Sequence, residues 1–240
     1  MPIKINKLES TRFGIVVANV VDNEAKLSEI NIAAKKQNVN LLTQRINVGN
    51  LNRFHSLEED GYRLMDTIVF YERPVDKLSS KLIKIDSTMF QFAEPDDASA
   101  VAELAQKAFQ NYFGHYHSDV RLDNSLSDDA YVEWAHASTS TACTTAPVLL
   151  AKYGKKITGF ISFKHHIDQT TEIILNAVHP GFRRRGIYKA LVVATLQHAH
   201  AEGAKTITAS TQINNYTAQK VWAQLGFLHI NSLYTLHKWY

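Results

Sequence analysis

Residues 178–188 join an apolar strand to an amphipathic helix and read Val178-His179-Pro180-Gly181-Phe182-Arg183-Arg184-Arg185-Gly186-Ile187-Tyr188. Pro180 predicts the end of the strand, and Gly186 permits a tight turn of the backbone. The first amides of the helix that follows have no partner inside the helix, so they can bind an anion with a favourable sign of the helix dipole. Each of the three arginines can donate charge-assisted hydrogen bonds to a phosphate. The segment therefore predicts a pyrophosphate-binding turn.

A run of three arginines is also compatible with a solvated charged loop. Its position favours phosphate binding, because it lies between a strand and a helix, next to a glycine and with no carboxylate nearby. The turn has neither the Gly-x-x-x-x-Gly-Lys pattern of a P-loop nor the three spaced glycines of a dinucleotide fold. ATP and NAD are therefore not expected ligands.

The composition indicates a globular protein. Of 240 residues, 45% are apolar and 20% are charged, which excludes disordered, collagen-like and disulfide-rich classes. The length allows one large domain or two small ones. The 26 basic and 23 acidic residues give a net charge of +3, too small for a general nucleic-acid binder. No nucleic-acid partner is expected.

The subcellular location is predicted from cysteine usage and hydropathy. A single cysteine, Cys143, cannot form an intramolecular disulfide, and residues 1–10 lack the apolar core of a signal peptide. No stretch approaches the ~20 apolar residues that span a bilayer. We therefore expect a cytoplasmic protein without membrane insertion.

Apolar periodicity predicts a mixed α/β fold in two parts. In the first part, strands are expected at 13–21, 39–46 and 62–73, and helices at 23–37 and 51–59. In the second part, we expect strands at 82–92, 147–153, 157–165, 170–178, 205–210 and 228–239, and helices at 95–109, 128–138, 186–202 and 215–225. Pro74 and the polar residues 75–81 suggest a boundary. The predicted domains are residues 1–78 and residues 79–240.

The basic turn resembles an element of the GNAT superfamily of CoA-dependent N-acyltransferases. There a strand ends near Val-x-Pro and is followed by Arg or Gln, two residues, Gly, one residue and a small residue. Arg183, Gly186 and Ile187 match, and Tyr188 stands where the family usually has Gly or Ala. A second match begins at Asn215, 32 positions on (215 minus 183), and continues through Trp222 to Gly226-Phe227.

The resemblance implies a GNAT fold with a smaller, truncated GNAT-like α/β domain at the N-terminus, and acyl-CoA as co-substrate. A backbone amide at Val178 would hold the thioester carbonyl oxygen. Trp222 stands where much of the superfamily has a tyrosine that protonates the departing thiolate, and an indole N–H does not release its proton near neutral pH, so the proton donor stays open. The implied CoA contacts are Asn176, Val178, Arg183, Arg184, Arg185, Gly186, Ile187, Tyr188, Asn215 and Trp222.

The whole sequence is similar to sugar N-acyltransferases that act on dTDP-amino-dideoxyhexoses, through Phe13-Gly14, Gly61-Tyr62, residues 109–113 and the aromatic last strand. This implies transfer of an acetyl or short hydroxyacyl group, such as 3-hydroxybutanoyl, to a 3- or 4-amino group for O-antigen or capsule synthesis. The alternatives are a peptide or antibiotic amine as acceptor, or a catalytically silent CoA-binding module; a homodimer is left open. The expected substrate contacts are Phe13, Tyr112, Phe113, His115, Tyr116, His117 and Tyr234.

Asp66 is a candidate general base. Alternate residues of the predicted strand 62–73 share a face, and Asp66 is the only polar residue at positions 64, 66, 68 and 70. A buried carboxylate is costly unless it is paired or its pKa rises, and a raised pKa suits a base. In the resembling enzymes a carboxylate at the matching position is the proposed base. The alternative is a structural aspartate satisfied by a backbone amide, Arg63 or Arg73.

Three histidine pairs lie close in sequence, at positions 115 and 117, 165 and 166, and 198 and 200. None has a cysteine or a third ligand at a spacing typical of zinc sites. Residues two apart on a helix do not face each other, so the last pair cannot chelate. No metal is expected.

Overall fold

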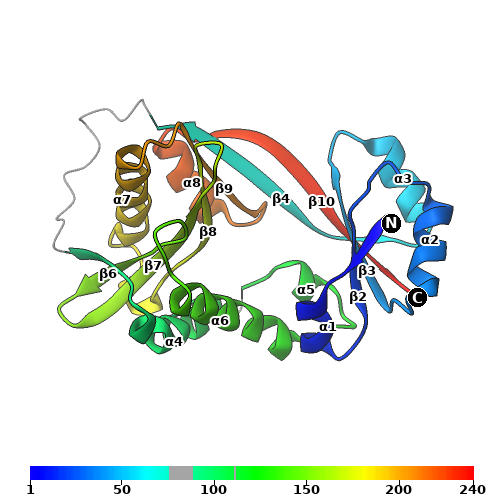
Figure 1. Ribbon diagram of the computed structural model, residues 1–240, viewed down its shortest axis with the longest axis horizontal. Helices are drawn as coiled ribbons and strands as arrows, with labels where there is room; N and C mark the ends of the chain where they lie inside the picture. Colours follow the sequence, from blue (N-terminus) through cyan, green and yellow to red (C-terminus); the bar gives the residue numbers. More distant parts are fainter. Residues whose placement is uncertain (76–88, 111) are drawn as a thin grey trace.

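The structure is a computed structural model that describes residues 1–75, 89–110 and 112–240. Its first part carries three helices and four strands (Figure 1). They are β1 (Ile3–Ile5), α1 (Lys7–Phe13), β2 (Val17–Val20), α2 (Leu27–Lys36), β3 (Leu41–Asn47), α3 (Leu51–Glu59) and β4 (Arg63–Pro74).

The remaining part begins with β5 (Phe90–Phe92). A short 3-10 helix, η2 (Pro95–Asp97), follows and leads directly into the longer α-helix α4 (Ala98–Phe109). Next come α5 (His115–Ser118), α6 (Asn124–Ser140), β6 (Val148–Tyr153), β7 (Lys156–His165) and β8 (Thr170–Val178). The chain continues through η3 (Pro180–Phe182), α7 (Ile187–Ala201), β9 (Thr206–Gln212), α8 (Tyr216–Gln224) and β10 (Leu228–Trp239).

The predicted mixed α/β fold is confirmed, and the bounds expected for α3, β8 and β10 match the structure. The strand expected at 13–21 was too long, because α1 ends at Phe13 and Gly14 caps it in the left-handed region at φ 65°. The loop expected before residue 128 contains α5, and α6 starts at Asn124, where the Asp123 side chain accepts a hydrogen bond from the Ser125 amide at 2.8 Å. Most of the strand expected at 82–92 lies outside the described residues.

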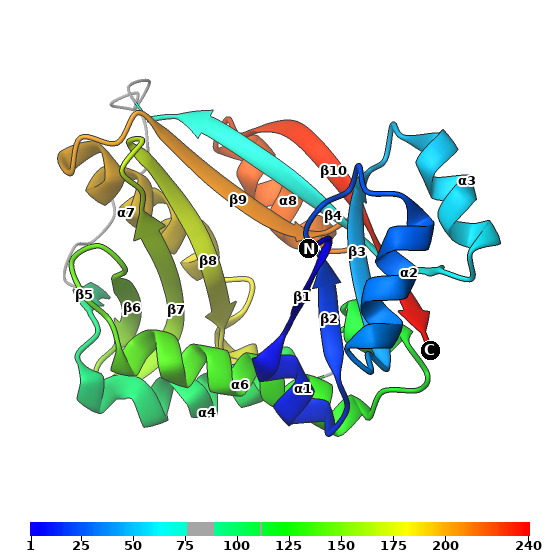
Figure 2. The ribbon, with the colours of Figure 1, turned by 45° about the vertical axis from the view of Figure 1, so that its right-hand side comes forward.

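Within the described residues, ten strands form one mixed sheet in the order β1-β2-β3-β10-β4-β9-β8-β7-β6-β5. The last strand of the chain lies inside the first part, antiparallel to both β3 and β4. β4 and β10 are 12 residues each, and they run from one part of the molecule to the other (Figures 1 and 2). The predicted boundary after residue 78 lies outside the described residues, and on either side of it the strands belong to one sheet.

Helices cover both faces of this sheet. α7 and α8 pack on one face of β6–β9, around the buried residues Leu191, Leu196 and Trp222. α4 and α6 pack on the opposite face, around Val101 and Phe160, and lie side by side in Figure 2. In the first part, α2 and α3 cover one face, while α1 and α5 lie at the other. No helix of the described residues is long and apolar enough to cross a membrane.

β8 and β9 separate along their length. They pair in parallel only from Thr170 to Ile173 of β8, against Thr206 to Ala209 of β9, and diverge beyond that point (Figure 2). The His179 amide donates to Thr158 on the β7 side at 2.9 Å. Because backbone groups alternate between the two edges of a strand, those of Asn176 and Val178 face the opening between β8 and β9.

Because β10 lies at the centre of the sheet, we predict that truncating a buried side chain of this strand destabilises both parts of the molecule together. Leu236 is fully buried beneath α2 and α3, so Leu236→Ala should lower the free energy of unfolding by about 2–5 kcal/mol. Urea unfolding followed by circular dichroism should show a single shifted transition. Leu228→Ala is the matched control, because Leu228 is on the same strand and 68% exposed. Two transitions, with only one of them shifted, would contradict a single cooperative sheet.

Candidate active site

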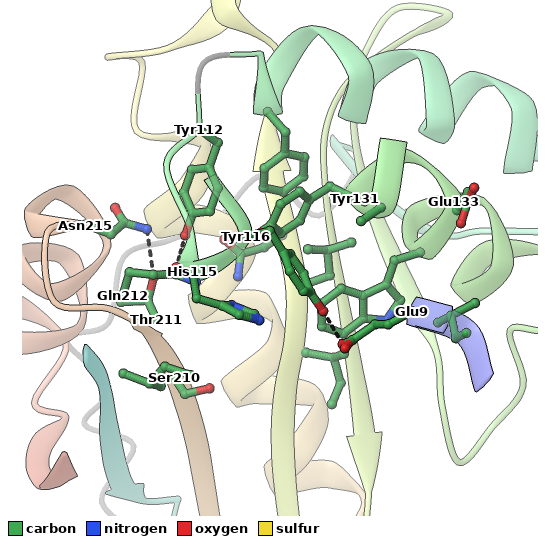
Figure 3. A pocket seen from close by; sticks show the side chains of 18 of the residues that line it. Glu9, Tyr112, His115, Tyr116, Tyr131, Glu133, Ser210, Thr211, Gln212 and Asn215 are labelled. Atoms are coloured by element: carbon green, nitrogen blue, oxygen red, sulfur yellow. Dashed lines mark hydrogen bonds between the residues drawn. The ribbon is translucent and has the colours of Figure 1, made fainter. Parts of the chain in front are cut away.

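A cavity of about 730 Å³ opens between the two parts of the sheet (Figure 3). Its walls come from α1, β3, β4, α4, α5, α6, β8 and β9, so it is built by segments far apart in sequence. Its size is that of a small-molecule site. The polar and aromatic lining residues include Glu9, Arg12, Arg45, Tyr112, His115, Tyr116, Tyr131, Glu133, Trp134, Asn176, Ser210, Thr211, Gln212 and Asn215.

The opening between β8 and β9 leads into this cavity. Asn176 on β8 and Ser210 on β9 line the cavity at the level where the two strands have already separated. Backbone groups of Asn176 and Val178 that face the opening have no strand to pair with among the described residues. Buried backbone groups require hydrogen-bond partners. The opening therefore fits an extended chain that carries amide groups and can pair with β8 as a strand would.

The N-terminus of α7 lies next to the end of β8. Gly186 precedes the helix at φ 78°, no side chain caps it, and a Cβ added there would meet no atom within 4 Å. Among the described residues, no side chain caps the first amides of this 15-residue helix. An anion placed there accepts hydrogen bonds from those amides and interacts favourably with the helix dipole.

The three arginines of the turn have different surroundings. Arg183 donates to the backbone oxygen of Ala108 at 2.8 Å, which ties the turn to the end of α4. The Arg185 guanidinium lies 5.1 Å from the centre of the Phe182 ring, and Arg184 adopts φ 65° with its side chain exposed. None of the ion pairs formed within the described residues involves these arginines. Arg184 and Arg185 therefore remain available to an anionic ligand.

Tyr188 and Trp222 meet between α7 and α8. Trp222 is 1% exposed and packs against Tyr71, with ring centres 5.4 Å apart. Burial raises the pKa of the Tyr188 phenol, and the neighbouring Trp222 side chain lowers it by less. A tyrosine thus occupies the first turn of α7, where the resembling family has a small residue, and its hydroxyl lies beside the indole of Trp222.

Asn215 has a structural contact that accounts for its position. Its side-chain oxygen accepts from the Ala218 amide at 3.3 Å and begins α8, and its Nδ2 donates to Thr211 at 2.9 Å (Figure 3). Asn215 also lines the cavity. An N-cap and a ligand contact are compatible, because the amide has hydrogen-bonding capacity beyond these two bonds.

Asp66 lies on the cavity side of β4. It shares a face with Ile68, which lines the cavity, whereas a shift of register at Met65 puts Leu64 on the opposite face and corrects the alternation expected from the sequence. Oδ1 accepts from the Thr67 amide at 2.5 Å, and Oδ2 is buried without a hydrogen-bond partner among the residues that the structure describes. Burial raises the pKa of Asp66 to about 6 against the Thr67 hydrogen bond and the charge of Arg45.

The structure brings three of the expected substrate residues together at the cavity: Tyr112, His115 and Tyr116. The Tyr112 hydroxyl hydrogen-bonds to Gln212, and the Tyr116 hydroxyl to Glu9 (Figure 3). Four others lie elsewhere. Phe13 packs behind Tyr116, Phe113 is 55% exposed, His117 bonds to Asp128, and Tyr234 packs against Phe54 on the opposite face of the sheet.

Several cavity residues were not found from the sequence. Arg12 of α1 forms an ion pair with Glu133 of α6 at 2.7 Å, and Arg45 lies on β3, opposite Thr235 of β10. Arg45 is the charged residue of a strand that is otherwise uncharged, which was a usable signal. Arg12 and Glu133 are 121 positions apart, and no local pattern indicates that they meet. No group of three or more His, Cys, Asp and Glu in the described residues is arranged to hold a metal.

The chain belongs to the acetyltransferase (GNAT) family, whose sequence profile matches residues 98–227. This match covers the helices, the sheet opening and the basic turn described above, and it extends from α4 to the start of β10.

Two curated proteins are related in sequence. The spore coat polysaccharide biosynthesis protein SpsD of Bacillus subtilis is 27% identical over 146 residues, 61% of this chain and 49% of that protein. Mycothiol acetyltransferase of Streptomyces scabiei is 33% identical over 84 residues, 35% of this chain and 27% of that protein. The chain thus matches about half or less of the length of either relative.

Solved structures share the fold over most of the chain. A GCN5-related N-acetyltransferase from Sphaerobacter thermophilus aligns with a TM-score of 0.67 at 12% identity, covering 99% of this chain and 76% of that one. A tandem GNAT protein from the clavulanic acid biosynthesis pathway aligns with a TM-score of 0.60 at 13% identity, covering 93% and 75%. At these identities the likeness establishes the fold.

The raised pKa of Asp66 predicts a pH-dependent cost to stability. Its folded pKa of about 6 lies above the ordinary value of 3.8, so ionisation is more costly in the folded protein and the cost grows as pH rises from about 4 to about 6. Asp66→Asn should be more stable than the parent by about 1–2 kcal/mol at pH 7.5, after a discount for partial solvent exposure, and by less at pH 4.5.

Urea unfolding at the two pH values measures this difference. Asp129→Asn is the control for the loss of one negative charge, because Asp129 is exposed on α6. An advantage of Asp66→Asn that is the same at both pH values would show that the Asp66 carboxylate is not destabilised by burial.

Proposed function

We propose that the protein transfers an acyl group from acyl-CoA to the amino group of a nucleotide-linked amino sugar. The observation that carries the proposal is the path from the open N-terminus of α7, through the gap between β8 and β9, into the cavity. These features follow one another in order: an anion site at the N-terminus of α7, the unpaired backbone edge of β8, and the cavity. Acyl-CoA has the same order of parts: a pyrophosphate, an arm with two amides, and a thioester.

The residues along the path fit acyl-CoA. The amides of residues 186–188, with Arg184 and Arg185, would hold the pyrophosphate. The backbone edge at Asn176 and Val178 would pair with the pantetheine amides, and Asn215 would contact the arm near the cavity. When bound, acyl-CoA supplies a thioester carbonyl that an amine can attack directly. The acyl group proposed is acetyl or a short hydroxyacyl such as 3-hydroxybutanoyl.

The acceptor side of the cavity fits a nucleotide sugar. Two cationic side chains, Arg12 and Arg45, and the rings of Tyr116, Tyr131 and Trp134 line it. Arginines bind diphosphates, and aromatic rings stack on bases and sugars. The relationship to a spore coat polysaccharide biosynthesis protein supports a sugar acceptor. A dTDP-linked 3- or 4-amino-6-deoxyhexose, used for a surface glycan, is the proposed substrate, and the cytoplasm is the proposed compartment.

The proposed chemistry places one proton acceptor and one hydrogen-bond donor at the reacting centre. Asp66, directly or through a water, would take the proton that the amine loses as its bond to the acyl carbon forms. The Val178 amide would donate to the carbonyl oxygen as negative charge develops on it. The part of the chain up to residue 78 is proposed to form the acceptor side, and the part from residue 79 the donor side.

A second candidate has support from the mycothiol acetyltransferase relationship, which favours an acyl transfer to a different small-molecule amine. Such an enzyme would turn over acetyl-CoA with a peptide, antibiotic or thiol-sugar amine, and dTDP would not inhibit it. A catalytically silent CoA-binding protein would be stabilised by CoA and would release no thiol with any amine.

Release of free CoA thiol tests the proposed reaction. Purified protein with acetyl-CoA or 3-hydroxybutanoyl-CoA and a panel of dTDP-linked 3- and 4-amino sugars should release thiol only when both substrates are present. With Asp66 as base, the rate should fall as pH drops below about 6, because the carboxyl becomes protonated. Asp66→Asn should lower kcat by about 10²–10⁴-fold, and Asp129→Asn should not. Absence of thiol release across the panel would refute the amino-sugar substrate.

The pyrophosphate site makes a separate prediction about binding. The double variant Arg184→Ala with Arg185→Ala should weaken CoA binding by about tenfold or more in calorimetric titration, because charge-assisted hydrogen bonds are lost. Pantetheine, which lacks the phosphates, should be unaffected. Arg63→Ala is the control, because Arg63 is exposed on β4. Unchanged CoA affinity in the double variant would exclude the basic turn as the phosphate site.

A further inference from the structure

A buried carboxylate behind the cavity fixes the orientation of a histidine. Asp119 Oδ2 accepts from His237 Nδ1 at 2.9 Å and from Trp239 Nε1 at 2.8 Å, and Oδ1 accepts from the Arg121 amide at 3.2 Å. Burial alone would raise the pKa of Asp119, but the hydrogen bonds from His237 and Trp239 lower it to about 2. An ionised carboxylate only accepts hydrogen bonds. His237 therefore carries its proton on Nδ1.

The Asp119 contact occupies one nitrogen of His237, and in a neutral ring the other nitrogen is an acceptor. With the proton on Nδ1, a neutral imidazole has a lone pair on Nε2. His237 is 1% exposed, and its Nε2 is buried without a hydrogen-bond partner in the described part of the chain. A buried polar atom left in this way is costly. The hydrogen bond to Asp119 explains the Nδ1 side of the ring and leaves the Nε2 side without a structural role.

The ring of His115 lies next to the ring of His237. The two imidazole rings have centres 5.6 Å apart and an interplanar angle of 82°. His115 is 8% exposed, and its Nδ1 is also buried without a partner in the described residues. Two complementary vacant positions thus belong to neighbouring rings: an acceptor on His237 and a ring nitrogen on His115 that can donate. A hydrogen bond between these two nitrogens, direct or through one bridging water, would satisfy both of them.

The far side of His115 belongs to the cavity. His115 lines it, and Figure 3 shows the imidazole among the side chains of Tyr112, Tyr116 and Thr211. Burial lowers the pKa of His115 well below its usual value, and the basic side chains around it, His237 on β10, Arg45 on β3 and His117 on α5, also disfavour a positive charge on this ring. The ring is therefore neutral at pH 7, with one donor and one acceptor nitrogen.

We propose that Asp119, His237 and His115 form a relay that keeps Nε2 of His115 as a hydrogen-bond acceptor directed at the cavity. Asp119 holds the proton of His237 on Nδ1, and Nε2 of His237 then holds the proton of His115 on Nδ1. The exposed lone pair of His115 selects an acceptor substrate with an amine or hydroxyl hydrogen at that point. His115 contacts the substrate, and His237 and Asp119 are positioning residues. The assignment of the ligand rests on the proposed function.

Two substitutions at His237 separate the relay from simple packing. In His237→Asn, the amide nitrogen can replace Nδ1 and keep the bond to Asp119, while the acceptor toward His115 is lost. In His237→Gln, the amide oxygen can reach the place of Nε2 and restore that acceptor. A structural role through Asp119 predicts that the asparagine is the better substitute. The relay instead predicts that His237→Gln is the better substitute.

Nitrogen-15 NMR of histidine-labelled protein tests the relay without any substrate. In the parent, His237 and His115 should both be protonated on Nδ1 and unprotonated on Nε2. In His237→Asn the Nδ1 tautomer of His115 should no longer be fixed, and in His237→Gln it should be restored. A parent protein with the His115 proton on Nε2, or a His115 spectrum unchanged by His237→Asn, would overturn the relay. This outcome does not depend on acyl transfer.

Kinetics with a dTDP-linked 4-amino-6-deoxyhexose tests the consequence for the substrate. His237→Asn should raise the KM for the sugar by about tenfold, the loss of one hydrogen bond, while the KM for acetyl-CoA stays unchanged and His237→Gln recovers most of the effect. His229→Asn is the control, since His229 lies on the same strand and bonds to Ser232 at 2.8 Å. Parent turnover with an unchanged sugar KM in His237→Asn would overturn the substrate contact. Absence of parent turnover would instead refute the proposed function.

Discussion

The insertion of β10 between β3 and β4 is the constraint on which the rest of the molecule depends. It joins the two parts of the chain into one sheet, because hydrogen bonds along both edges of a 12-residue strand connect them. It also determines what lies beneath the cavity. Thr235 and His237 point toward the cavity face, opposite Arg45 and Thr43 of β3, so the polar floor exists only when the last strand has paired.

The opening between β8 and β9 is the second consequence of the sheet. Parallel pairing ends after four residues, and the unpaired backbone of β8 lies between Asn176, which lines the cavity, and the turn that leads to the N-terminus of α7. A donor that enters along this path and an acceptor that binds among Arg12, Arg45 and Tyr116 would meet at Asp66. In the proposed relay, the buried pair of Asp119 and His237 supports His115, which lines the cavity.

Local signals were sufficient for the elements and for the basic turn. The bounds of α3, β8 and β10, and the turn at residues 178–188, followed from apolar periodicity, Pro180 and Gly186, because these depend on neighbouring residues. Contacts between residues far apart in the sequence could not be predicted from such local signals. The register shift at Met65, which moves Leu64 to the other face, and the packing of Tyr234 on Phe54 depend on which strands become neighbours. The ion pair of Arg12 and Glu133 depends on it as well.

The sequence by itself determined the mixed α/β class, the basic strand-to-helix turn and the family resemblance that the match over residues 98–227 confirms. Only the tertiary structure decided which polar residues share the cavity, because that choice depends on strand order and on the insertion of β10, a contact between residues nearly 200 positions apart. Asp119, His237 and His115 illustrate the difference. No sequence pattern links these three residues. Their chemistry arises because they share a buried environment, where polar groups need hydrogen-bond partners.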